Sequence, residues 1–361
     1  MVEISVFSKD LKYIDEIDNF TSLQWVRRYN NAGTFELHCP VTEHNIKILL
    51  RKNLIWKQGS DEVGIIGYRN LTTDSTGVEN IKINGRFCTS ILDRRILYST
   101  EQHTNKQVEL IMRGMVDKNC ISTVSERHLP IVLGNLNNFS ARIDYQKAYG
   151  NLLEELNILS ETSDIGFLIR TDMETGLHYF ETYKGVDRSV NQDVNSHVVF
   201  SRENDNLYEQ EYTDSTDNFR TTAIVAGEGE GIDREVIEVQ NQYSGISRRE
   251  LFVDARDLQS EVDDEVIPLA EYRNLLNQRG LEKLAEHKEI QTFEGKIITN
   301  NYTYKEDYDL GDIVTVMDKK WNVTVDTRIT EVNEIYENGN VSIVPTLGNK
   351  IPTIIDKLKR M

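Results

Sequence analysis

The sequence predicts a mainly β protein with an α+β insertion. Segments in which apolar and polar residues alternate recur over residues 1–100 and from about 201 to 361, as expected for strands with one buried face. Amphipathic helical spacing is concentrated between these two regions. The chain has 361 residues, enough for two or three cores, but only five prolines and no Pro-, Gly- or Ser-rich linker. We therefore expect domains that are interleaved or closely packed.

Residues 1–100 are predicted to form the first β domain. Turn signals such as Asn31 to Gly33 and Asp74 to Gly77 separate its short alternating segments. The segments are VEISVFS, SLQWVRRY, GTFELHCP, EVGIIGYRNL and VENIKINGRF. Many short strands at this spacing are typical of a sandwich or small barrel.

Residues 101–200 are predicted to form an α+β accessory domain. Thr104 and Gln107 fit a capping box for a first helix. Its buried face would carry Val108, Ile111, Met112, Met115 and Val116. A second helix is expected from Tyr145 to Leu159, with a stripe of Tyr149, Leu152, Leu153, Leu156 and Leu159. The segments IGFLIRT and LHYFETYKG then predict a β-hairpin.

Residues 201–361 are predicted to form a second β domain, with one helix at about 268–288. Pro268 suits the first turn of that helix, and Leu269, Tyr272, Leu276 and Leu284 form its stripe. Strands are expected in NLYEQEYT, FRTTAIVAG, REVIEVQN, RRELFVDA, FEGKIITNN, IVTVMDKK, TRITEVNEIY and VSIVPTL. Two β regions of similar size hint at a duplicated barrel, although no fixed repeat is present.

The stretch VAGEGEGIDR, residues 225–234, raises the possibility of a phosphate-binding loop. Its glycine spacing fits neither a dinucleotide fingerprint nor a P-loop, and Glu228 and Glu230 would repel phosphate. The following REVIEVQN alternates with the period of a strand. We therefore interpret the stretch as a connection between two strands.

The composition favours a binding or assembly protein over an enzyme. The net charge of −18 argues against tight nucleic-acid binding, although it would suit a conduit through which DNA passes. No membrane span or signal peptide is apparent, so we expect synthesis in the cytoplasm. Three separated cysteines and seven scattered histidines give no disulfide framework, metal motif or catalytic constellation. We name no catalytic, cofactor-binding or metal residue.

Several stretches together resemble the tail-hub proteins of long-tailed, non-contractile bacteriophages and prophages. They occur in the expected order and cover nearly the whole chain. They are SLQWVRRYNNAGTFELHCP, GRFCTSILDRRI, IDYQKAYGNLLEEL, NLYEQEYTDSTDNFRTTAIVAGEGEG, RRELFVDARDL and YDLGDIVTV. The resemblance implies two barrel-like tube domains plus accessory helix-bearing domains, similar to the hubs of contractile-tail baseplates.

The same resemblance implies a homotrimer at the tail tip of the virion. Its pseudo-six-fold ring would join the six-fold tail tube to a three-fold tip and leave a channel for DNA. The implied partners are the distal tail protein, the tape-measure protein and other tail-tip or receptor-binding proteins, with DNA only in transit. Hub relatives often carry wall-cleaving or receptor-binding domains, and the chain closes at DKLKRM, so we expect those activities on another protein. The alternatives are a wall-degrading tail enzyme and the hub of a bacteriocin or injection particle.

Two stretches are candidates for the contact between copies. In the first, Gly227, Gly229 and Gly231 lack side chains that would keep a neighbouring chain away. The second, from Arg248 to Asp257, alternates in charge and includes Arg248, Arg249, Asp254 and Arg256.

Overall fold

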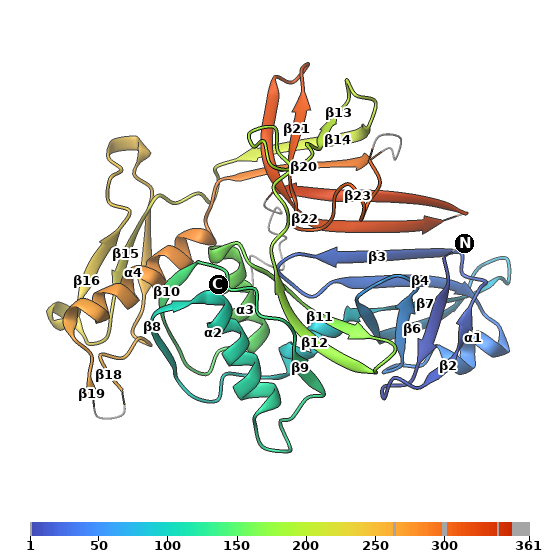
Figure 1. The fold of residues 1–361 in the computed structure, drawn as a ribbon, viewed down its shortest axis with the longest axis horizontal. Helices are drawn as coiled ribbons and strands as arrows, with labels where there is room; N and C mark the ends of the chain where they lie inside the picture. The colour runs from blue at the N-terminus through green and yellow to red at the C-terminus, as the bar shows by residue number, and fades with distance from the viewer. Residues whose placement is uncertain (1, 263–264, 298–301, 338, 349–361) are drawn as a thin grey trace. The chain divides into compact units, whose positions relative to one another are not determined.

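The structure, a computed structural model, describes residues 2–262, 265–297, 302–337 and 339–348. The segment DKLKRM, residues 356–361, lies outside the described residues. The chain divides into two compact units (Figure 1), of which unit 1 holds residues 1–91, 166–213 and 292–361, and unit 2 holds residues 92–165 and 214–291. Each unit combines separated stretches of sequence. The three consecutive domains 1–100, 101–200 and 201–361 stay a prediction, because a division into compact units does not test where domains begin and end.

Unit 1 is built almost entirely of strands. They are β1 (Ile4–Phe7), β2 (Tyr13–Ile17), β3 (Ser22–Arg28), β4 (Thr34–Pro40), β5 (Leu54–Lys57), β6 (Val63–Thr73), β7 (Glu79–Phe87), β11 (Gly166–Asp172), β12 (Leu177–Tyr183), β13 (Val199–Ser201), β14 (Leu207–Ser215), β20 (Ile290–Ile297), β21 (Ile313–Asp318), β22 (Val323–Glu337) and β23 (Asn340–Gly348). Its helices are α1 (Glu43–Ile48) and the 3-10 helix η1 (Cys88–Arg94).

Thirteen of these strands form one sheet, in the order β14-β20-β23-β22-β3-β4-β7-β6-β5-β1-β2, with β21 on β22 and β13 on β21. The mainly β class is confirmed. The path of the sheet ends at β14 and β2, however, so the barrel-like tube domains expected from the resemblance are not closed barrels in the described residues. The predicted hairpin is present as β11 and β12, paired from Gly166↔Tyr183 to Asp172↔Leu177.

Two of the apolar cores in the described residues lie in unit 1. In the first, the rings of Trp25 and Phe87 lie 4.5 Å apart and that of Phe35 lies 6.0 Å from Trp25. Phe35 lies over Gly64 and Gly85, where a Cβ atom would come within 2.4 Å and 2.9 Å of its ring. The second core surrounds Phe200 and Tyr308 on β13 and beside β21. The three cysteines of the chain, Cys39, Cys88 and Cys120, are buried and free.

The antiparallel pairing of β3 with β22 joins the two β regions of unit 1, from Arg28↔Glu331 to Ser22↔Glu337. Leu23, Trp25 and Arg27 alternate into the interior, so a guanidinium occupies a core position. Arg27 donates to Tyr304 at 2.7 Å and to Asp309 at 2.8 Å.

Further buried charges lie beside the β3–β22 junction. The Nε atom of Arg27 lies 3.5 Å from the carboxylate of Glu62, whose pKa burial raises to about 7 although Arg27 opposes the shift. The Lys57 ammonium lies 2.9 Å from Glu334, and both side chains are buried. Because an uncompensated buried charge is costly, each of these groups constrains where its partner's strand can lie.

Unit 2 combines strands and helices. The strands are β8 (Glu101–Gln107), β9 (Ile131–Leu133), β10 (Arg142–Lys147), β15 (Thr222–Ala226), β16 (Val236–Val239), β17 (Glu250–Asp254), β18 (Glu261–Val262) and β19 (Glu265–Val266). The helices are α2 (Val108–Val116), the π-helix η2 (Asp117–Ile121), α3 (Leu152–Ser163), the 3-10 helices η3 (Gly231–Asp233) and η4 (Gly245–Ser247), and α4 (Leu269–Ala285). No helix in the described residues is long and apolar enough to cross a membrane.

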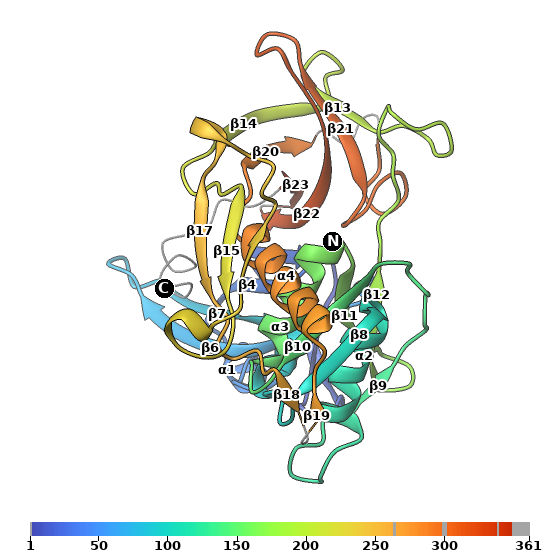
Figure 2. The ribbon, with the colours of Figure 1, turned by 90° about the vertical axis from the view of Figure 1, so that its left-hand side faces the viewer.

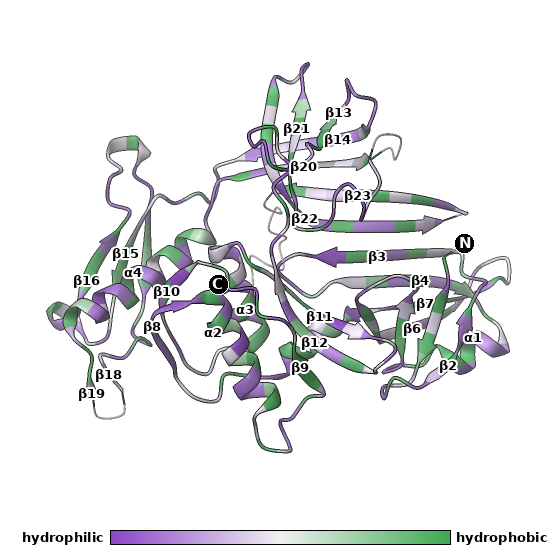
Figure 3. Ribbon diagram, viewed as in Figure 1, coloured by the Kyte–Doolittle hydropathy of each residue, from purple (hydrophilic) through white to green (hydrophobic). Residues whose placement is uncertain are grey.

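The predicted buried face of the first helix is confirmed, since all five of its residues are buried in α2, whose two faces differ in hydropathy (Figure 3). The capping box is wrong. Thr104 lies in β8, which pairs with β10, and Gln107 makes no side-chain cap. The pairing of β8 with β10 therefore overrides the local capping signal.

The second and third helices are present with corrected ends. α3 begins at Leu152 because the side chain of Asn151 accepts from the N–H groups of Leu153 and Glu154. Tyr145 lies in β10, and Tyr149 is 71% exposed, so Tyr149 does not belong to the stripe. The helix expected at about 268–288 is α4, in which Tyr272, Leu276 and Leu284 are buried but Leu269 is exposed.

We expect Gly85→Ala to lower the free energy of unfolding by about 2 kcal/mol or more, because overpacking a core commonly costs 1–3 kcal/mol. The new Cβ atom would lie 1.8 Å from the carbonyl oxygen of Ile65 on β6. Gly67→Ala is the matched control, since its Cβ atom would meet nothing closer than 3.9 Å. Urea denaturation followed by circular dichroism measures both. Equal effects of the two substitutions would contradict the packing of Phe35 against the β6–β7 pair.

Candidate interface

The two predicted contact stretches lie together on one small sheet of unit 2. The sheet has the order β16-β15-β17, in which β15 pairs antiparallel with β16 and parallel with β17. α4 covers one face, where Val225, Val239 and Val253 are buried against the helix. Gly280 allows this close approach, because a Cβ atom there would lie 2.6 Å from Val239 and 2.9 Å from Val225.

The glycine stretch connects β15 to β16, as the sequence predicted. Gly227 is fixed by packing within the unit, because a Cβ atom there would lie 2.4 Å from the Tyr272 hydroxyl. That hydroxyl accepts from the N–H of Glu228 and donates to the carbonyl of Leu258. Glu228 itself accepts from the N–H and hydroxyl of Ser260. The start of the loop is therefore held in place by α4 and the segment after β17.

Gly229 and Gly231 have a different role from Gly227. Their φ angles are +98° and +57°, in the region that favours glycine. No atom lies within 4 Å of a Cβ atom placed on Gly231, and the nearest to one on Gly229 is at 3.6 Å. A bulky residue at Gly229 would therefore strain the loop itself, so it cannot serve as a specific probe of a contact between copies.

The four charged candidates have partners within unit 2. Arg248 bridges Glu238 on β16 and Glu250 on β17. Asp254 accepts from both Arg234 and Arg256, which lowers the pKa of its carboxyl group well below the ordinary value. Arg249 donates to the carbonyl of Thr216, and its guanidinium lies 5.6 Å from the ring centroid of Phe219. These residues stabilise the sheet, and Arg256 is the most exposed of them.

The face of the sheet opposite α4 also carries apolar residues that the sequence analysis missed. Phe252 is 63% exposed and Val236 is 52% exposed, and Ile232 and Ile246 are almost fully exposed in the loops at the two ends of β16. Within the described residues, β16 and β17 each pair on one side only. The sequence of β17, ELFVD, could have indicated this face. Leu251 and Val253 pack in the core, and because side chains alternate along a strand, Phe252 points to the opposite face.

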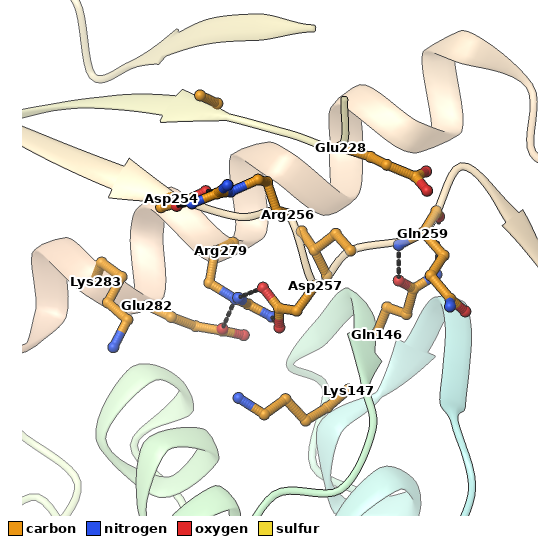
Figure 4. Close-up of polar contacts among 12 residues, drawn as sticks. Gln146, Lys147, Glu228, Asp254, Arg256, Asp257, Gln259, Arg279, Glu282 and Lys283 are labelled. Carbon is orange, nitrogen blue, oxygen red and sulfur yellow. Dashed lines mark hydrogen bonds and ion pairs between the residues drawn. The ribbon is translucent and has the colours of Figure 1, made fainter. Parts of the chain in front are cut away.

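A partly buried polar network, also missed, joins α4 to the rest of unit 2 (Figure 4). Arg279 on α4 binds Asp257 through two hydrogen bonds, at 2.8 Å and 3.0 Å. The Gln146 amide on β10 pairs with the backbone of Gln259, accepting from its N–H at 2.8 Å and donating to its carbonyl at 3.3 Å. The network connects the two separated stretches that make up unit 2.

Glu282 on α4 is the most strongly perturbed acid of this network. The pKa of its carboxyl group is raised to about 7, mainly by burial and also by Glu155, against the opposing effects of Arg279 and Lys147. Lys147 is already engaged by Glu155 at 3.1 Å, and the Nε atom of Arg279 is 3.6 Å from Glu282. Glu282 is therefore a buried acid with incomplete compensation.

No other arrangement in the described ranges points to chemistry. In those ranges, no three side chains of His, Cys, Asp or Glu meet in a way that could hold a metal ion. Asp309 accepts a hydrogen bond from Arg27, and Asp312 accepts one from the N–H of Val186, between β12 and β13. The seven candidate residues thus lie in one small sheet and its connecting loops. Contacts within the subunit account for the need for glycine at position 227 and for the partners of most of the charged residues.

We expect Glu282→Gln to remove a pH-dependent loss of stability. A folded-state pKa of about 7, above the ordinary value of 4.5, means that the stabilisation is fully present below pH 4.5 and is lost as the pH rises through 7. The free energy of unfolding at pH 8, relative to that at pH 4.5, should therefore rise by about 1–3 kcal/mol in the variant. Urea denaturation across this range measures it, with Glu271→Gln on the exposed face of α4 as control. Unchanged pH dependence would show that Glu282 is ionised in the folded state.

Comparisons with known proteins agree with this fold. The tail protein from Neisseria meningitidis MC58 is 13% identical, with a TM-score of 0.56 and coverage of 96% of each chain. The 43 kDa tail protein of prophage MuSo2 from Shewanella oneidensis is 12% identical, with a TM-score of 0.57, covering 96% of this chain and 98% of its own. Prophage tail protein gp18 from Listeria monocytogenes EGD-e is 12% identical, with a TM-score of 0.57, covering 99% and 97%. Among curated proteins, no sequence match was found.

The family model described as Siphovirus ReqiPepy6 Gp37-like protein matches residues 3–349, nearly the whole chain. The resemblance to tail proteins of long-tailed bacteriophages and prophages is confirmed by this match and by the shared fold. The chain belongs to the Siphovirus ReqiPepy6 Gp37-like protein family.

Proposed function

We propose that this protein is the structural hub of a phage tail tip. Three copies would form a ring that joins the six-fold tail tube to a three-fold tip and leaves a channel for DNA ejection. The observation that carries the proposal is the family match over residues 3–349, in a chain whose fold is that of prophage tail proteins. The role is one of assembly, with no catalytic step assigned to the chain.

The small sheet of unit 2 supports an assembly role. A three-fold ring needs two different complementary surfaces on each copy, so that each contact is heterologous and the ring closes. β16 and β17 offer two separate strand edges, and Phe252 and Val236 offer exposed apolar area between them. In the proposed ring the sheet contacts a neighbouring copy, with Gly229, Gly231 and Arg256 at the rim of the contact.

The proposal assigns the expected partners to the ring. The distal tail protein and tape-measure protein would bind it, other tail-tip proteins would extend it, and DNA would only pass through. The net charge of −18 suits such passage because a lumen that attracts phosphate would slow it. The same ring would serve in a virus or in an injection particle, since only the cargo differs.

We expect the purified protein to form trimers, seen as three-fold rings in negative stain and as a trimer mass in light scattering. A stable monomer at high concentration would contradict the hub role. Phe252→Asp should raise the concentration at which trimers dissociate at least tenfold, about 1.4 kcal/mol, without lowering Tm. Val194→Asp is the matched control, since Val194 is 88% exposed in unit 1. Trimers unaffected by Phe252→Asp would remove the sheet from the contact while leaving the hub role standing.

A further inference from the structure

β6 in unit 1 runs beyond the strand beside it. It pairs with β7 along its length, from Gly64↔Phe87 to Thr73↔Glu79, but with β5 only from Val63 to Ile65. Two further backbone hydrogen bonds follow, in which the carbonyl of Ile66 accepts from Lys52 and its N–H donates to the carbonyl of Asn53. Beyond Ile66, β6 and the segment before β5 separate. From Gly67 to Thr73 this side of β6 has no backbone partner in the described residues. Figure 2 shows the light-blue β6–β7 hairpin reaching past its neighbours.

A hollow lies along this free edge. Its walls are the segment after α1, from Leu50 to Lys52, and β6 from Gly67 to Leu71. The volume of the hollow is about 630 Å³, within the range of binding clefts. An extended segment placed in it would run beside the unpaired N–H and C=O groups of β6. Such free edges are templates for an added strand.

Three cations line the hollow without a carboxylate partner in the described residues. They are Arg51, Lys52 and Arg69. Arg69 donates to the carbonyl of Ile46 at 2.9 Å, and its buried Nε atom has no hydrogen-bond partner among the described residues. The chain as a whole is acidic, with 59 acidic and 41 basic residues. Three neighbouring cations without a carboxylate partner in the described residues therefore form a local positive site on an acidic protein.

The hollow also exposes apolar surface. Leu50, Tyr68 and Leu71 are 45%, 46% and 48% exposed. Because these side chains are large and apolar, covering them with a partner would be favourable. Cations beside exposed leucines and an aromatic ring suit a partner that has both carboxylates and apolar side chains. Nucleic acid would satisfy the cations but would leave the strand edge and the leucines uncovered.

We propose that the free edge of β6 binds an extended acidic segment of a partner protein, which adds to the sheet as a further strand. Its carboxylates contact Arg51, Lys52 and Arg69, and its apolar side chains cover Leu50, Tyr68 and Leu71. Backbone hydrogen bonds supply affinity that does not depend on side-chain identity, and the side chains select the partner. The inference does not depend on the hub role or on the trimer.

The test uses a fluorescein-labelled peptide in which glutamate alternates with valine and leucine, titrated with the full chain and followed by fluorescence anisotropy. We expect binding that weakens with added salt and at least tenfold weaker binding by the Arg51→Glu, Lys52→Glu double variant. The control is the Lys319→Glu, Lys320→Glu double variant, which makes the same charge change at an exposed turn of unit 1. Thermal denaturation of all variants establishes that they are folded.

Two competitor experiments separate the sources of affinity. A peptide of the same sequence in which every backbone nitrogen is methylated cannot donate the backbone hydrogen bonds, and we expect it to bind at least tenfold more weakly. Absence of binding, equal losses in the two double variants, or equal binding of the methylated peptide would overturn the proposal. Equal displacement by single-stranded DNA of matched charge would also overturn it, because the hollow would then be a general anion surface. Loss of trimers in the Arg51→Glu, Lys52→Glu variant would also contradict the proposal, because it would show that the edge of β6 binds another copy of this chain.

Discussion

The pairing of β3 with β22 is the constraint on which unit 1 depends. It joins residues 22–28 to residues 331–337, so the two β regions become one sheet. Arg27 makes this pairing specific, because its buried guanidinium needs Tyr304 and Asp309 from the segment before β21 and lies beside Glu62. A shift of register by one residue would turn Trp25 and Arg27 to the opposite face and leave these carboxylates unpaired.

This constraint explains why the chain carries no linkers. Between β3 and β22 the chain leaves unit 1 and returns twice, and unit 2 is built from these two excursions, 92–165 and 214–291. The excursions are joined inside unit 2 by the contacts of α4 with α3 and β10, and by the pair of Gln146 with Gln259. Both surfaces to which we assign partners lie on strands that have no pairing partner on one side within the described part of the chain, namely β16 and β17 in unit 2 and the end of β6 in unit 1.

Sequence reasoning predicted the elements whose signals are local. The face of α2, the β11–β12 hairpin and the strand connection at Gly227 were all predicted from periodicity and turn residues. It failed where the structure of a segment depends on pairing with a segment far away in the sequence. Thr104 and Tyr145 lie in strands because β8 and β10 pair with each other, and the open path of the large sheet depends on strands far apart in the chain. The polar network around Arg279 could not be predicted, because Arg279 and Asp257 lie in different segments and neither belongs to a motif.

The most direct test of this account is residue-resolved hydrogen exchange of β3 by NMR. Alternate amides of a central strand point to its two neighbours, so β3 has one set directed at β4 and another directed at β22. If the pairing is as described, both sets exchange with similarly high protection, as in the interior of a sheet. If the set directed at β22 exchanged as fast as the amides of a free edge, the two β regions would not share a sheet and the account would be wrong.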